Sequence, residues 1–319
     1  DIASDSLMKC LKEDNSPIEL EFAEILWKQG ENDRALKLVQ EIHFKYENSE
    51  NVDKKVKARV LLKYTEWLDL SNNSASAQII DQYKLLLKLC PQWYQPYYSF
   101  GQYYSSLIEK RNAEGLSSDG TWEFKSISYF LAAFAQNAIH VRENLPKVVT
   151  FWLDISDAAV RNRTETTGIM LKRASEKICE YITDALKRCP IYIWYSVLTQ
   201  LLSRLLHSHE RTALLIKEIL FQLTIEYPTH MLWYITVLQN STVGNRVKVG
   251  DFIMSKYQQH SKSDTNLLRD AQLLTTSLTR VSMQDTSKVR GKNSGLLEND
   301  FKFKMSIAPT HMTVPVRIN

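Results

Sequence analysis

The first strong pattern of apolar and polar positions predicts two antiparallel helices in the range 19–46. Apolar residues recur every three or four positions on both sides of a glycine, as expected for helices that bury one face. They are Phe22, Ile25, Leu26 and Trp27 before Gly30, and Ala35, Val39, Ile42 and Tyr46 after it. Gly30 stands where a helix end favours positive φ, and Asn32 or Asp33 can cap the second helix. These positions together predict a helix hairpin.

Similar patterns predict three more helix pairs further along the chain. The expected pairs are 56–70 with 77–90, 96–108 with 122–140, and 146–160 with 168–188. Polar stretches separate their members. Because a hairpin cannot cover its own apolar face, each pair must stack on its neighbours, as in solenoids. The predicted fold class is therefore all-α: an α-α superhelix of TPR-like and HEAT-like helical hairpin repeats, with a short extended segment at the C-terminus.

A proline shortly before a Trp-Tyr pair occurs three times. Proline ends one helix and suits the first turn of the next, because its missing N–H would have no partner there. We expect the aromatic pair to pack the new helix on its neighbour, and we expect Trp233 to lie in the core. The predicted repeat anchors are Trp27, Gly30, Trp93, Pro190, Trp194, Pro228 and Trp233.

The same patterns divide the chain into four parts. We expect TPR-like repeats over 1–140 and HEAT-like repeats over 141–281. A flexible loop is predicted over 282–299, which is rich in Ser, Asp, Asn, Lys and Gly. Alternating apolar and polar positions near the end predict that 300–319 begins a new domain. Since the chain does not begin with Met and stops in mid-pattern, we expect it to be a segment of a longer protein.

Composition supports helices more than strands. Hydrophobic residues make up 44% and charged residues 24%, with only nine Gly and eight Pro. A net charge of +4 over 319 residues is too diffuse to predict nucleic-acid binding. No run of about 18 apolar residues predicts a membrane span. The four cysteines match neither a disulfide framework nor paired zinc ligands.

Sequence motifs for catalysis are missing from the chain. It has no glycine-rich nucleotide loop, no His-Arg-Asp catalytic loop and no Gly-x-Ser-x-Gly elbow. His207 and His209 are two positions apart, so on a helix their rings would point in different directions. We therefore predict no catalytic, cofactor-binding or metal site. A metal-dependent hydrolase using His207 and His209 remains an alternative.

Three short stretches carry a family resemblance. They are Leu-Leu-Ser-Arg-Leu-Leu-His-Ser-His at 201–209, Tyr-Pro-Thr-His-Met-Leu-Trp at 227–233, and Asn-Arg-Val at 245–247. In order and spacing they resemble the C-terminal part of the FAT domain in ATR-type checkpoint kinases, members of the phosphatidylinositol 3-kinase-related kinase family. Phe-Lys-Met at 303–305 and Val-Pro-Val at 314–316 are similar to the run that leads into the kinase small lobe. Loops rich in Asn and Ser favour fungal relatives.

The resemblance implies a regulatory scaffold rather than a catalytic body. It implies a FAT segment that clamps and positions the kinase domain of a nuclear serine/threonine kinase in the DNA-damage and replication-stress checkpoint. The implied partners are the chain's own kinase domain and an ATRIP-type subunit, in a homodimer of heterodimers that meets DNA only indirectly and no membrane. ATP and Mg would bind the parent kinase domain, beyond residue 319. The candidate kinase-contacting residues are His207, His209 and Arg246.

Two further alternatives stay open. A free-standing helical-repeat adaptor could grip peptides on its concave face. A sister kinase of the TOR or ATM type would share the same repeats, although the Ser-Arg-Leu-Leu-His-Ser-His stretch argues against it.

Overall fold

The computed structural model describes residues 16–49, 52–71, 75–162 and 166–283. These residues form helices and connecting turns without a strand, so the prediction of an all-α fold of helical repeats is confirmed. The chain divides into two compact units, one up to His140 and one from Val141 onward. Among the described helices, none combines the length and apolar character needed to cross a membrane.

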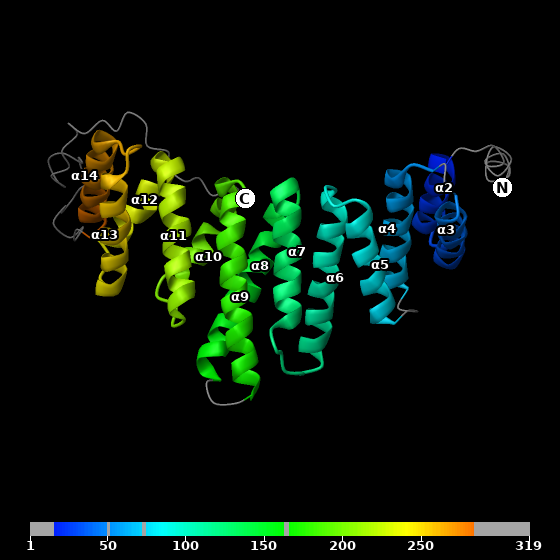
Figure 1. Cartoon of the computed structure of the whole chain (residues 1–319). Helices are drawn as coiled ribbons and strands as arrows, with labels where there is room; N and C mark the ends of the chain where they lie inside the picture. The colour runs from blue at the N-terminus through cyan, green and yellow to red at the C-terminus, as the bar shows by residue number, and fades with distance from the viewer. Residues whose placement is uncertain (1–15, 50–51, 72–74, 163–165, 284–319) are drawn as a thin grey trace, which may run out of the picture. The chain divides into compact units, whose positions relative to one another are not determined.

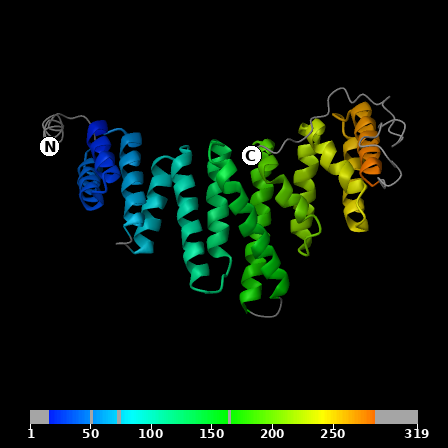
Figure 2. The same cartoon turned by 180° about the vertical axis from the view of Figure 1, so that it is seen from behind.

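The first unit contains six described helices. In both views they follow one another in chain order, each beside the next (Figures 1 and 2). They are α2 (Ser16–Lys28), α3 (Asn32–Glu47), α4 (Lys54–Leu70), α5 (Ser76–Leu89), α6 (Tyr94–Ala113) and α7 (Thr121–Gln136).

The hairpin of α2 and α3 forms as the sequence predicts. Gly30 ends the first helix with φ of 86°, a conformation that costs glycine little. The stripe Ala35, Val39, Ile42 and Tyr46 is buried. Two details of the prediction are wrong: Ile25 is 45% exposed, and α3 is preceded by Glu31, which makes no capping bond with its side chain.

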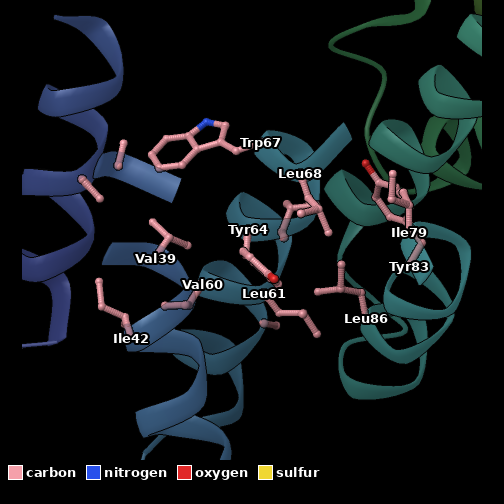
Figure 3. Close-up of a cluster of buried hydrophobic side chains, with 14 of the residues drawn as sticks. Val39, Ile42, Val60, Leu61, Tyr64, Trp67, Leu68, Ile79, Tyr83 and Leu86 are labelled. Atoms are coloured by element: carbon pink, nitrogen blue, oxygen red, sulfur yellow. The ribbon is translucent and has the colours of Figure 1, made fainter. Parts of the chain in front are cut away.

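Apolar side chains from α2 to α6 form one buried cluster in this unit, part of which Figure 3 shows. Leu61 and Tyr64 of α4 lie between the side chains of α3 and those of α5 (Figure 3). Trp27 stacks on Trp67 with ring centroids 4.5 Å apart and an interplanar angle of 5°. Each fully buried large apolar side chain contributes about 1.5–3 kcal/mol, so this cluster is the main source of the unit's stability.

Helices α6 and α7 pack tightly around Gly101. A Cβ atom there would lie 3.0 Å from the ring of Phe130, and the Ser126 hydroxyl donates to the Gly101 carbonyl at 3.0 Å. At the other end of the hairpin, Arg111 and Glu123 form a buried ion pair of 2.5 Å. A small residue and a buried charge pair therefore fix how these two helices lie together.

The second unit begins with two long helices and continues with shorter ones. They are α8 (Val141–Arg161), α9 (Thr166–Arg188), the 3-10 helix η1 (Ile191–Val197), α10 (Leu198–Ser203), α11 (Glu210–Glu226), α12 (Pro228–Gln239), α13 (Gly244–Gln259) and α14 (Thr265–Ser282). Its largest fully buried side chains include Trp152 and Trp194, each with no exposed surface.

The proline-aromatic elements differ from one another in the structure. Pro190 precedes a 3-10 helix, and Trp194 of that helix is fully buried. Pro228 opens α12 as predicted, but Trp233 is only half-buried, so its core assignment is wrong. The buried positions of α12 are Met231, Leu232, Ile235, Thr236 and Leu238. Trp93 is also half-buried and stands just before α6.

The C-terminal predictions fall mostly outside the described residues. This holds for 300–319 and for all of 282–299 except Ser282 and Met283. The loop was expected to start at Ser282, but α14 includes that residue.

Candidate functional site

The stretch that carries the family resemblance ends in a loop, Arg204–His209, between α10 and α11. This loop contacts α8 through Asp157 and α9 through Glu176. Two neighbouring carboxylate clusters result, both inside the second unit.

The first cluster centres on His207, whose side chain is only 1% exposed. Its Nδ1 accepts the backbone N–H of His209 at 3.0 Å. The neutral ring therefore carries its proton on Nε2, which lies 3.1 Å from Oδ1 of Asp157. The second oxygen of Asp157 accepts from Arg204 at 3.3 Å. One carboxylate thus fixes two residues of the loop.

The charge state of His207 follows from its burial. Loss of water lowers the pKa of this imidazole below its ordinary value of 6.5, Asp157 acts in the opposite direction, and Arg204 adds to the lowering. Burial has the larger effect because the charged ring would lose its hydration. His207 is neutral at physiological pH.

The second cluster lies at the start of α11. His209 is the N-cap residue, and its Nδ1 accepts the backbone N–H of Thr212 at 3.3 Å. Its Nε2 lies 3.7 Å from Oε1 of Glu176. Arg211 also pairs with Glu176 and lies 3.4 Å from Glu180. Burial, the largest effect, lowers the pKa of His209, and Glu176 opposes it.

A chain of buried hydroxyls connects the same helices. Ser156 of α8 lies 3.0 Å from Ser175 of α9 and 2.9 Å from Thr212 of α11, measured between side-chain oxygens. The Sγ of Cys179 lies 3.6 Å from the same Thr212 oxygen. All four residues have no exposed surface. We call these hydroxyls, with Asp157, Glu176 and the loop residues they bind, the α8–α11 network.

The network is suited to holding helices rather than to catalysis. A substrate cannot reach an imidazole that is 1% exposed. Burial raises the pKa of the Cys179 thiol and raises that of Cys189 to about 11, so neither is an activated nucleophile. Within the described residues, no group of three or more His, Cys, Asp or Glu side chains is placed to hold a metal ion. Buried polar contacts of this kind make the packing of their helices specific.

The structure separates the three candidate contact residues. His207 and His209 belong to the network, whereas Arg246 is exposed in the first turn of α13. Asp157 and Glu176, the two carboxylates that hold the loop, were not predicted from the sequence. The only local signal was the pair Glu176 and Glu180, four positions apart and thus on one helix face.

Two family models match the chain. Residues 1–150 match the FAT domain, and residues 177–275 match the HEAT repeats of serine/threonine-protein kinase ATR-like proteins. The second match includes the loop Arg204–His209. Asp157 and Glu176, which hold that loop, precede the matched residues. The chain belongs to the FAT-domain family of ATR-type kinases. The predicted resemblance is therefore confirmed.

The curated relatives are kinases with much longer chains. The chain is 55% identical over its whole length to serine/threonine-protein kinase MEC1 of Candida glabrata, of which it covers 13%, and 50% identical to MEC1 of Eremothecium gossypii, of which it covers 14%. It is 25% identical to serine/threonine-protein kinase ATR of Arabidopsis thaliana over 66% of the chain and 9% of that relative. The prediction of fungal relatives is confirmed.

A solved structure of the FAT and kinase domain of CtTel1 has the same fold. Its TM-score is 0.69 with 14% sequence identity, over 99% of this FAT chain and 25% of that chain. At this identity the likeness shows the fold alone. The aligned region includes the helical repeats of both units.

Proposed function

We propose that this FAT chain clamps and positions the kinase domain of a checkpoint serine/threonine kinase. The observation that carries the proposal is the α8–α11 network. The family stretch 201–209 supplies an internal brace rather than reactive groups, with His207 almost fully covered. A regulatory scaffold needs this rigidity, because a flexible scaffold would not hold the kinase domain in a defined position.

In the proposed mechanism, the kinase domain contacts the exposed surface of the second unit, whose helices α8, α9 and α11 are held together by the network. Arg246 is the candidate contact that remains exposed, and it stands at the start of α13. In this proposal, ATP and Mg bind the kinase domain. Regulation then requires two arrangements of the second unit that favour different kinase states. An ATRIP-type subunit, a dimer of such complexes and a nuclear location belong to the same proposal.

The proposal is tested by reversing one exposed charge in the intact kinase. Arg246→Glu is expected to change kinase activity severalfold without changing the melting temperature, because an exposed residue contributes little to stability. Lys248→Glu is the matched control, since Lys248 is exposed on the same helix and carries the same charge. Equal activities of both variants and the unmodified kinase would remove Arg246 from the contact.

The alternatives are less well supported. The curated relatives that this chain resembles are kinases, which does not favour a free-standing adaptor. The match to ATR-like HEAT repeats favours the ATR type over TOR or ATM. The hydrolase needs His207 and His209 at an open metal position, yet His207 faces Asp157 inside the protein and His209 caps α11.

A further inference from the structure

A groove runs along one face of α4 in the first unit, away from the α8–α11 network. It consists of two adjoining pockets of about 790 and 300 Å³ that share Arg59 and Trp93. We call it the α4 groove. Its floor is α4, and the turn between α5 and α6 forms a wall of both pockets. Helix α2 forms the opposite wall of the smaller pocket only.

The positions that line the floor follow from helical spacing. Lys55, Arg59 and Lys63 are four positions apart, so they lie along one face of α4. The opposite face carries the buried residues Ala58, Leu61, Thr65 and Leu68. Because the apolar face of α4 packs against the core, the face with Lys55, Arg59 and Lys63 lines the groove.

The first half of the groove offers positive charge. Lys55 and Arg59 are exposed, and within the described part of the chain neither forms an ion pair. Asp53, the nearby acid, is the N-cap of α4 and accepts the Lys55 backbone N–H at 3.3 Å. The two cations are thus available to bind an acidic group.

The second half of the groove carries glutamates, two of which have polar or charged partners. Lys63 lies 3.2 Å from Glu24, and Glu66 accepts from the Ser99 hydroxyl at 2.7 Å. Glu21 also lines this half. A polyanion that followed the whole groove would therefore meet carboxylates after the first two cations, which disfavours a nucleic-acid backbone.

An apolar surface lies between the two halves. Trp93 lines both pockets and is half-buried, with Val56 and Pro91 beside it in the first. Along α4, the distance from Lys55 to Glu66 is about 16 Å, the length of about five extended residues. The groove matches a short extended peptide in length, charge and apolar content.

We propose that the α4 groove binds an extended acidic peptide segment of a partner protein. Its carboxylates pair with Lys55 and Arg59, and an apolar side chain two or three positions further along packs on Trp93. Recognition of this kind combines an apolar anchor with charge complementarity.

The test uses the whole 319-residue chain and three pools of labelled peptides of about eight residues, long enough to fill the groove. One pool has two acidic positions followed by an apolar one, the second replaces the acids by lysines, and the third replaces the apolar position by glycine. Fluorescence anisotropy is expected to show binding of the first pool only. A labelled single-stranded DNA of matched length is the fourth probe, and its preferential binding would overturn the proposal.

Two variants locate the binding. Lys55→Glu is expected to weaken binding of the first pool about five- to tenfold, because it replaces an attraction by a repulsion. Lys54→Glu is the matched control, since Lys54 is the exposed neighbour on α4 and does not line the groove. Equal weakening by both variants would indicate a general charge effect and contradict the proposal.

Cys90 gives an independent readout within the groove. Its free thiol is half-buried and lines the first pocket. The first pool is expected to slow alkylation of Cys90 by iodoacetamide, measured by mass spectrometry, and the lysine pool is not. An alkylation rate that stays the same while the first pool is bound would place the peptide elsewhere and overturn the assignment.

Discussion

Nε2 of His207 lies 3.1 Å from Oδ1 of Asp157, although α9, η1 and α10 come between them in the chain. The same aspartate holds Arg204 at 3.3 Å. One side chain of α8 therefore fixes the loop from which α11 starts.

Asp157→Ala is expected to destabilise the second unit by about 1–3 kcal/mol, because it leaves His207 without its carboxylate and Arg204 without its partner. Asp157→Asn keeps a polar oxygen beside Nε2 of His207 and an acceptor for Arg204, so its cost should be smaller. Urea unfolding measures both. Asp184→Ala is the surface control, with a side chain that is 66% exposed. An Asp157→Ala variant as stable as this control would contradict the role of Asp157.

The pH dependence of stability should reflect the buried histidines. Burial lowers the pKa of His209 below 6.5, so the unfolded chain binds the proton more readily. Stability is therefore lost as the pH falls below 6.5, and His43 and His207 act in the same direction. The titratable and charged groups that act on His209 are Glu176, His207, Arg211 and Lys172.

His209→Asn removes one of these titrations but keeps a residue that caps helices well. The loss of melting temperature from about pH 7.5 to about pH 5.5 should be smaller in this variant. Glu66, whose pKa is raised by burial, stabilises the fold as the pH falls toward 4.5, and it does so equally in both proteins. An identical pH profile would show that His209 titrates as it does in the unfolded chain.

Replacing Trp194 or Trp233 by alanine should lower the free energy of unfolding by different amounts. Trp194→Ala is expected to destabilise the second unit by about 3–5 kcal/mol, as for a fully buried aromatic residue. Trp233→Ala should cost less, because Trp233 is half-buried and loses fewer contacts. Thermal unfolding of the two variants compares them, and the reverse order would contradict the burial of these rings.

The buried ion pair in the first unit offers a double-mutant test. Glu123→Leu leaves Arg111 buried without its 2.5 Å partner and should cost about 3–5 kcal/mol. Replacing both, as Arg111→Met with Glu123→Leu, should recover most of that loss, because neither charge remains to be desolvated. Additive effects in the cycle would show that the pair is not coupled.

Helices were predictable from the sequence because their signal is local. Gly30 at the end of α2 and the stripe of α3 needed only spacing and backbone preference. Burial of aromatic residues was less predictable. Trp194 and Trp233 follow similar prolines, yet only the first is covered, because coverage depends on which other helices pack against each face.

The candidate site was predicted only in part, because it too depends on which helices pack against one another. His207 and His209 attracted attention as a pair, but their roles depend on Asp157 and Glu176, which belong to two other helices. A single sequence does not record which helices become neighbours. Family resemblance found the loop, and only the three-dimensional arrangement gave it a structural role.

The central claim is that the α8–α11 network braces a block that positions the kinase domain. The most direct measurement is the kinase activity of the intact protein carrying Asp157→Ala or Asp157→Asn, assayed below the unfolding transition of both. We predict that Asp157→Ala lowers activity severalfold and that Asp157→Asn restores most of it. Activity unchanged by Asp157→Ala, in a protein that has lost stability, would contradict the claim.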